Sequence, residues 1–212
     1  MKEFEAGLDA YLQGDYATTV CLWTSAATSG DPRAQYNLGV LYDAGDRVPK
    51  NEQQALAWYR MAAMQGYADA QFNLALMLQA GQGVRANSPE AAVWYRCAAD
   101  QNHADAQFNL AQMLADGEGL AQDYSEAVRW YQMAAGQSHP QAANNLAIRY
   151  AMGQGVTQDN IQAYIWFSVA AELGDGLAGR HRDRVANELT PDQIIQSGKR
   201  AKETLTRIRR KT

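Results

Sequence analysis

The chain has 212 residues and a formal net charge of −4, with 47% hydrophobic and 20% charged residues. This composition is typical of a globular protein with enough apolar residues for a sizeable core. No apolar run approaches the roughly 18 residues that a membrane-spanning helix needs. Met1-Lys2-Glu3-Phe4-Glu5 lacks a cationic start and an apolar block, so we expect no secretory signal. Two cysteines, Cys21 and Cys97, cannot form a disulfide framework, and we therefore expect a cytoplasmic protein.

The chain is built from a repeat. The pattern Ala-x-x-Asn-Leu recurs with a fixed step of 36 residues, beginning at Ala34, Ala70, Ala106 and Ala142. Such a period predicts stacked copies of one supersecondary unit, because a single unit cannot bury its apolar face alone. We expect one solenoid domain over 1–212, in which 3–33 is a degenerate N-terminal repeat. Four full repeats follow at 34–69, 70–105, 106–141 and 142–177.

Each full repeat opens with a predicted helix. If its alanine is position 1, apolar or small residues recur near positions 1, 5, 8 and 9, which lie on one face of a helix. Position 12 is glycine in every copy, and glycine tolerates the left-handed conformation that ends a helix. These residues are Gly45, Gly81, Gly117 and Gly153. A second glycine follows two residues later in three copies, whereas the first copy has Arg47 there.

A second helix is predicted after a short loop. Position 18 is Asn or Asp, and position 21 is Glu or Gln, an arrangement that resembles a capping box. The predicted caps are Asn51, Asn87, Asp123 and Asp159. Alanines and a tryptophan recur on one face of this helix, so we expect the tryptophans to pack in the core between layers. They are Trp23, Trp58, Trp94, Trp130 and Trp166.

The last segment, 178–212, is predicted to be a basic helical cap. Thr190 is the expected N-cap of a new helix, with Pro191 in its first turn. Its apolar residues could cover the end of the stack: Ile194, Ile195, Ala201, Leu205 and Ile208. Residues 177–212 carry ten Lys and Arg against four Asp and Glu, whereas residues 1–176 carry nine against 19.

The repeat resembles the Sel1-like repeat, a relative of the tetratricopeptide repeat. The second copy carries the pattern in full, as Ala70-Gln71-Phe72-Asn73-Leu74, Gly81-Gln82-Gly83-Val84, Ala91-Ala92-Val93-Trp94-Tyr95 and Ala98-Ala99. The resemblance covers about residues 34–177. It implies an all-α, right-handed α/α superhelix with a concave face lined by the first helices, and an adaptor that assembles other macromolecules. Some bacterial members are secreted and carry a cysteine pair in each repeat, a pattern that this chain lacks.

The asparagine at position 4 of each repeat is the leading candidate for function. Asparagine is a mediocre helix former, so its recurrence needs a reason. These residues are Asn37, Asn73, Asn109 and Asn145. By resemblance to tetratricopeptide repeats, the position borders the concave groove, where amides can hold a peptide main chain. Alternatively, each asparagine bonds a neighbouring repeat and is purely structural.

Two further positions could line the same groove. Position 3 contains Tyr36, Phe72 and Phe108, and position 7 contains Val40 and Leu76. Exposed, these apolar side chains would favour partner binding; otherwise they belong to the core between helices. Asp43 and Asp116 could add negative charge that suits a basic peptide, or they could simply be solvated.

No catalytic or metal-binding motif is present. The sequence lacks Gly-x-Ser-x-Gly, His-Glu-x-x-His and a phosphate-binding glycine loop. Ser197-Gly198-Lys199 has the wrong spacing for Ser-x-x-Lys, which leaves a penicillin-binding-like hydrolase as a remote alternative. His103 and His139 share one repeat position, but no other ligand recurs beside them. We expect neither an enzyme nor a cofactor or metal.

The sequence therefore predicts a scaffold that binds a peptide or partner helix in its concave groove, as a monomer or weak dimer. A second hypothesis is contact with nucleic acid or an acidic membrane surface through the basic C-terminal helix. Its cations are Arg200, Lys202, Arg207, Arg209, Arg210 and Lys211. No aromatic side chains for base stacking are interleaved with them, and a solvated terminal helix explains the same charges.

Overall fold

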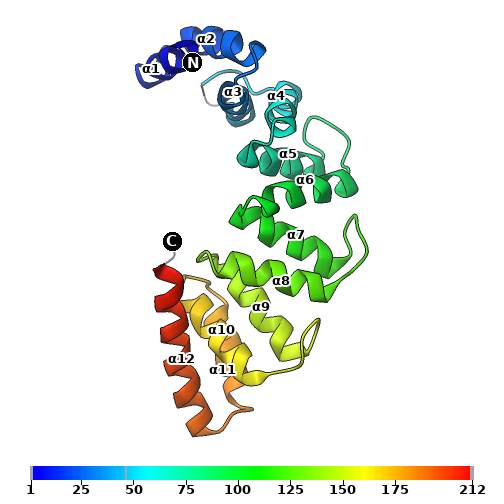
Figure 1. Ribbon diagram of the computed structural model, residues 1–212, viewed down its shortest axis with the longest axis vertical. Coiled ribbons are helices and arrows are strands. Elements are labelled where there is room, and N and C mark those ends of the chain that lie inside the picture. The colour runs from blue at the N-terminus through cyan, green and yellow to red at the C-terminus, as the bar shows by residue number, and fades with distance from the viewer. Residues whose placement is uncertain (1, 46, 211–212) are drawn as a thin grey trace. The chain divides into compact units, whose positions relative to one another are not determined.

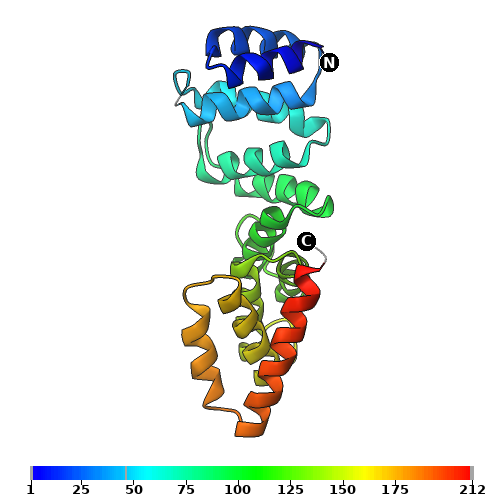
Figure 2. The same ribbon diagram turned by 90° about the vertical axis from the view of Figure 1, so that its left-hand side faces the viewer.

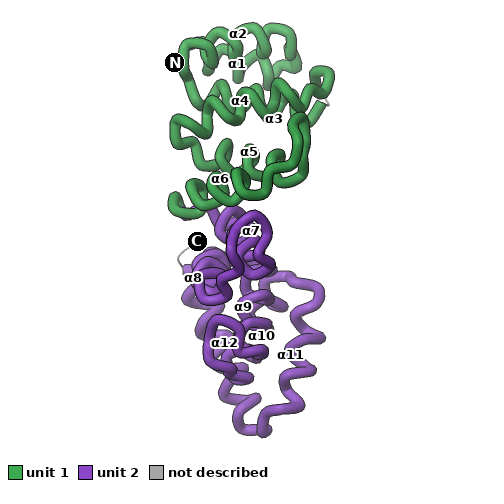
Figure 3. Tube along the Cα trace, turned by 90° about the vertical axis from the view of Figure 1, so that its right-hand side faces the viewer, with its two compact units in different colours: residues 1–101 green, residues 102–212 purple. Residues whose placement is uncertain are grey.

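The computed structural model describes residues 2–45 and 47–210 (Figure 1). Within this part of the chain there are twelve helices and no strand, so the predicted all-α solenoid is confirmed. The helices form two compact units, residues 1–101 and 102–212, which Figure 3 distinguishes by colour. Among the described residues, no helix is long and apolar enough to cross a membrane.

The first unit contains three helix pairs. They are α1 (Lys2–Leu12) with α2 (Tyr16–Thr28), α3 (Pro32–Ala44) with α4 (Glu52–Met64), and α5 (Ala68–Ala80) with α6 (Ser88–Asp100). The two helices of each pair pack together, and the second helix of one pair packs against the first helix of the next. A short turn at Gly14, whose φ is 79°, joins α1 to α2.

The second unit contains two full pairs and two further helices. The pairs are α7 (Ala104–Asp116) with α8 (Tyr124–Ala135) and α9 (Pro140–Met152) with α10 (Asn160–Glu172). The chain then forms α11 (Ala178–Ala186) and α12 (Pro191–Arg209). Both of these helices pack against α10. Ala178, at the place where a fifth repeat would begin, is fully buried.

The predicted helix caps are confirmed. The side-chain oxygen of Asn51 accepts a hydrogen bond from the backbone N–H of Gln54 at 3.0 Å, and the three equivalent residues make the same contact. The four glycines at position 12 end the first helices with φ between 65° and 74°. Thr190 and Gln193 form a reciprocal capping box at the start of α12, and Pro191 lies in its first turn.

The core of each unit is made of small residues and tyrosines. The alanines at position 1 and the leucines at position 5 are fully buried, which lets neighbouring helices approach closely. The rings of Tyr59, Tyr95 and Tyr131, on the second helices, are at most 2% exposed. The ring of Tyr59 lies against Gly39, where a Cβ would stand 2.5 Å from Cδ1. Gly39 is therefore needed for space rather than for backbone freedom.

The prediction that all five tryptophans lie in the core is wrong for four of them. Only Trp23 is buried, at 3% exposed, because it occupies the place that the tyrosines take in later repeats and lies against Gly7. The other four are half-exposed: Trp58, Trp94, Trp130 and Trp166. Each stands one residue before the buried ring, so its side chain points toward the edge of the layer.

The C-terminal helix covers α10 much as expected. Ala201, Leu205 and Ile208 are buried and Ile194 is half-buried. Ile195 is wrongly predicted to cover the stack, because it is 59% exposed. Ile195 comes two residues before the buried Ser197. At 100° per residue, the two side chains are therefore about 160° apart around the helix axis.

Candidate partner-binding site

Two of the position-4 asparagines, Asn73 and Asn145, contact a tyrosine of the preceding second helix. Asn145 Nδ2 donates to the hydroxyl of Tyr131 at 3.3 Å. Asn73 likewise bonds the hydroxyls of Tyr59 and Tyr36. These contacts give the tyrosine hydroxyls a hydrogen-bond partner. They agree with the alternative interpretation that each asparagine bonds a neighbouring repeat for a structural reason. Each amide has further donor and acceptor capacity beyond these bonds, and both side chains are half-exposed.

The surroundings of the tyrosine hydroxyls raise their pKa values further above neutral pH. Burial raises the pKa of Tyr59 well above its ordinary value, and the nearby Asp43 carboxylate raises it further. Burial also raises the pKa of Tyr131, against a smaller opposing effect of the hydrogen bond with Asn145. The neutral phenol can therefore act as a stable anchor for the asparagine.

Asn37 has a different environment. Its preceding helix carries Trp23 where later repeats carry tyrosine, and the indole Nε1 donates to the carbonyl of Phe4 at 3.2 Å. Trp23 therefore offers Asn37 no hydroxyl, and among the described residues the Asn37 amide makes no side-chain hydrogen bond. Among the described residues, Asn37 and Asn109 are thus position-4 amides that make no side-chain hydrogen bond, so their hydrogen-bonding capacity is available to a ligand.

Asn37 lines a small hollow on the first unit. The hollow has a volume of about 200 Å³ and is formed by Leu8, Tyr11, Trp23, Asn37, Val40, Leu41 and Ala44. Val40 is 38% exposed, and so is Leu76 at the same repeat position on α5. Position 7 is therefore on the surface in this unit, which favours the groove interpretation over the core interpretation for these two residues.

A second hollow lies on the second unit, between α9, α10 and α11. Its volume is about 210 Å³, and its lining is mostly apolar: Ile148, Ala151, Met152, Phe167, His181, Arg184 and Val185. Ile148 occupies position 7 of its repeat, as Val40 does in the first unit. The two hollows therefore share that position, although they take their other walls from different parts of the repeat.

The position-3 aromatics are half-buried between other rings. Tyr36 packs against Tyr59 and Tyr67, with ring centroids 6.0 and 5.1 Å apart. Phe108 packs in the same way against Tyr131 and His139, at 6.1 and 4.6 Å.

Phe72 packs against Tyr95 at 5.9 Å. These contacts assign the aromatics a packing role within each unit, while their half-exposed edges remain open to a ligand.

The acidic candidates differ from one another. Asp43 is half-buried near Tyr59, whereas Asp116, the last residue of α7, is exposed. Asn109 is half-exposed on the same helix. The structure places Asn37, Val40 and Asp43 on α3, within two turns of one another.

His139 is part of a helix terminus rather than of a metal site. Its Nδ1 accepts from the backbone N–H of Ala142 at 3.2 Å, and its Nε2 lies 3.3 Å from Asp105 Oδ1. His103 caps α7 in the same manner. No group of three potential metal ligands occurs among the described residues.

Sequence reasoning missed a network of buried glutamines at position 2. Gln71, only 5% exposed, donates from Nε2 to the carbonyl of Ala63 at 3.1 Å and accepts from Gln101 Nε2 at 2.7 Å. The same contacts join Gln35 to Ala27 and Gln65. In the second unit, Gln107 accepts from Gln137 at 2.8 Å. The recurrence of glutamine at two positions of each repeat is a signal that could have revealed the network.

The comparisons agree with this architecture. The Sel1 repeat model matches residues 32–67, 68–103, 104–139 and 140–175, more than half of the chain. The chain belongs to the Sel1 repeat family. Sel1 repeat proteins are generally protein-interaction scaffolds that bind other proteins. The Sel1 fold is typically a non-catalytic scaffold. No curated protein matches the chain in sequence.

Solved Sel1 repeat structures are similar to this one. A Sel1 repeat protein from Oxalobacter formigenes is 32% identical, with a TM-score of 0.82 over 95% of this chain and 85% of that one. The protective antigen c5321 from uropathogenic Escherichia coli is 27% identical, with a TM-score of 0.62 over 97% of this chain and 53% of that one. Cysteine rich protein B of Helicobacter pylori is 18% identical, with a TM-score of 0.51 over 61% of this chain and 96% of that one, and shares the fold.

Proposed function

We propose that this Sel1 repeat protein is a non-enzymatic scaffold that binds a peptide or helix of another protein along the first helices of its repeats. The observation that carries the proposal is the hollow beside Asn37. It combines the Asn37 amide with the exposed side chain of Val40 and the partly buried side chains of Leu8 and Tyr11, and such a combination is typical of sites that bind a peptide through both its main chain and its side chains.

Several candidate residues would have supporting roles in each unit. In the first unit, Val40 and Leu76 would contact apolar side chains of the ligand, while Asn37 would bond its main chain and Asp43 would attract basic residues. Asn73 and Tyr36 would border the same surface. In the second unit, the corresponding candidates are Asn109, Asn145, Phe108 and Asp116, with Phe72 on α5 of the first unit completing the proposed set.

The test begins with peptides selected from a displayed random library against the whole protein. Their affinity is then measured by fluorescence anisotropy for the wild type and two variants, Asn37→Ala and Val40→Ser. We expect each substitution to weaken binding about tenfold, which corresponds to about 1.4 kcal/mol. The melting temperature should stay within a few degrees of the wild type, because both side chains are partly exposed.

Val93→Ser is the matched control, since it removes the same side chain from a 59% exposed position on the second helix α6. This variant should bind the selected peptides as the wild type does. Equal losses in Val40→Ser and Val93→Ser would contradict the proposed site.

A further inference from the structure

The two C-terminal helices leave an open cleft above the last repeat. In a full repeat, the first and second helices pack along one another. Here α12 packs on α10 and makes little contact with α11. Figure 2 shows α11 and α12 diverging from the turn that joins them. The resulting cleft has a volume of about 430 Å³, within the range of ligand-binding pockets.

The floor of the cleft is a polar stripe on α10. Tyr164, Ser168 and Glu172 follow one another at intervals of four residues and so share one face of this helix. The other repeats carry Leu56, Ala92 and Val128 at the place of Tyr164. The last repeat therefore has a phenol where its predecessors have an aliphatic side chain. Ser168 Oγ donates to the carbonyl of Tyr164 at 2.8 Å and can still accept a hydrogen bond.

Each wall of the cleft contributes one cation. Arg182 comes from α11, and Lys202 comes from α12, where Gly198 and Ala201 leave room beside it. Arg182 donates from Nε and Nη2 to Asp183 Oδ1, an exposed neighbour, and neither bond uses Nη1. Lys202 has no ion-pair partner among the described residues. Glu172 is the single carboxylate among the described residues that line the cleft.

We propose that this cleft binds an acidic segment of a partner protein. The cations Arg182 and Lys202 come from different helices, and the hydroxyls of Tyr164 and Thr206 also line the cleft, a lining that matches carboxylates carried on an extended chain. Ala201 and Leu205, which are buried where α12 packs on α10, make part of the lining apolar. Glu172 limits the affinity by repelling the ligand. This site is separate from the grooves of the proposed function and does not depend on them.

The probes are fluorescein-labelled peptides of alternating glutamate and leucine, with glutamine replacing glutamate in the control peptide. Fluorescence anisotropy measures their binding to the whole protein at low and moderate salt. We expect the glutamate peptide to bind in a salt-sensitive manner and the glutamine peptide to bind at least about tenfold more weakly.

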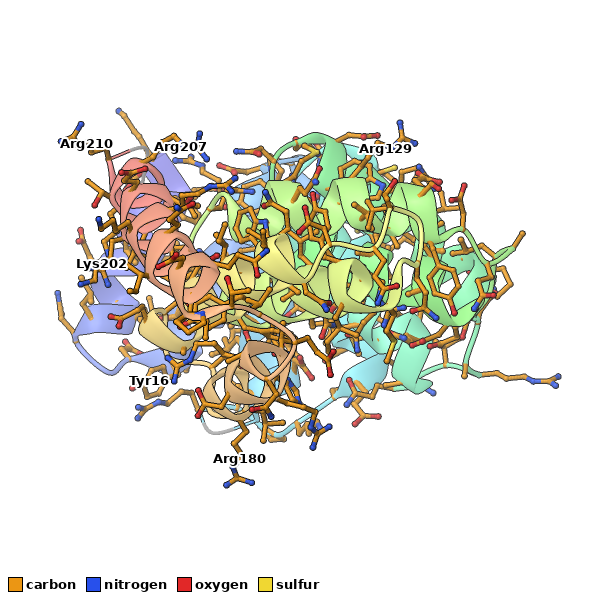
Figure 4. All side chains as sticks on the ribbon, turned by 90° about the horizontal axis from the view of Figure 1, so that it is seen from below. Tyr16, Arg129, Arg180, Lys202, Arg207 and Arg210 are labelled. Atoms are coloured by element: carbon orange, nitrogen blue, oxygen red, sulfur yellow. The ribbon has the colours of Figure 1, made fainter. Side chains whose placement is uncertain are left out.

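Three variants locate the site. Arg182→Gln with Lys202→Gln should weaken binding at least about tenfold, because both ionic partners are lost. Arg129→Gln with Arg180→Gln removes the same charge outside the cleft and should change affinity less than twofold. Figure 4 shows that Arg129 and Arg180 point outward, well away from Lys202. Glu172→Gln should tighten binding severalfold by removing the repulsion.

Three results would overturn the proposal. Equal losses in the two double variants would mean that net charge alone attracts the peptide. An unchanged affinity in Glu172→Gln would mean that the peptide binds outside the cleft. This variant tests the proposal even if Arg182→Gln with Lys202→Gln fails to fold. Binding of a labelled single-stranded DNA or of phosphatidylserine vesicles, without binding of the peptide, would assign the basic surface to nucleic acid or membrane instead.

Discussion

Within each of the first three full repeats, two glutamine side chains are hydrogen-bonded to each other. Gln71 and Gln101 bond one another, as do Gln35 and Gln65. In the last repeat, the two equivalent places are taken by Ala143 and Leu173. Both members of the pair have thus changed together, which avoids a buried amide with no partner.

This pairing predicts a non-additive effect of substitution. Gln71→Ala should lower the free energy of unfolding by about 1–3 kcal/mol, because the Ala63 carbonyl and the Gln101 amide lose their partner. Gln71→Ala with Gln101→Leu reproduces the combination of the last repeat and should cost less than the sum of the two single changes. Urea unfolding of the four proteins of the cycle measures the difference, and strict additivity would contradict the pairing.

His139 predicts a pH-dependent stability. Burial lowers the pKa of His139, and this effect exceeds the opposing attraction of Asp105. The unfolded chain therefore binds a proton more readily than the folded one, so stability falls as the pH drops below about 6.5 and levels off below the folded pKa. His139→Tyr places there the residue found at the equivalent Tyr67 and removes this titration.

Melting temperatures measured between pH 7 and pH 5 test the prediction. The wild type should lose more stability over this range than His139→Tyr does. The variant also loses the cap to the Ala142 N–H, which shifts its melting temperature by a similar amount at every pH. The slope is therefore the informative quantity, and equal slopes would show that His139 is not responsible.

At the scale of whole elements, the first two helix pairs are held together by a ring that fits against a glycine, whereas later repeats have alanine at the place of Gly39. Gly7 faces Trp23 and Gly39 faces Tyr59, in each case with room for no Cβ. This contact sets the distance between the two helices of the pair, and the close packing of the helices buries the ring.

Gly39→Ala should therefore destabilise the protein by about 1–3 kcal/mol, because the buried Tyr59 ring must shift to make room for the Cβ, which the later repeats already accommodate as Ala75 and Ala111. The control is Gly198→Ala on α12, where a Cβ meets nothing within 4 Å. That variant should gain up to about 1 kcal/mol, since alanine is the better helix former. Thermal unfolding of both variants checks the opposite signs, and a neutral Gly39→Ala would refute the steric explanation.

At the scale of the whole molecule, most of the fold follows from the sequence, while most of the candidate site does not. The repeat, the helix caps and the position-12 glycines are local patterns that need only neighbouring residues. Which ring of Trp58-Tyr59 enters the core depends on packing against the first helix of the pair, and so the sequence pointed to the wrong one. The partners of the asparagines also come from other helices. The cleft beside α11 depends on how α12 returns across α10, which no local pattern encodes.

The C-terminal helix predicts how the molecule responds to truncation. Removal of residues 191–212 uncovers the surface of α10 that Ala201, Leu205 and Ile208 bury. We expect a lower melting temperature and increased fluorescence of a hydrophobic dye, because a solenoid needs a polar end. Ile195→Ala, at an exposed position of the same helix, should change neither measurement appreciably. An unaffected truncation would show that α12 is dispensable for the fold.

The altered joint after the fourth repeat also has a consequence for how the chain can grow. Duplication of the segment 104–139 directly after residue 139 would join copies whose glutamine and ring pairs match. The same segment inserted after residue 175 would carry its own glutamine pair, but its Asn109 would face Phe167, which lacks the hydroxyl that Tyr131 offers to Asn145. Lengthening by recombination, in nature or in the laboratory, should therefore succeed within the array and fail at its end.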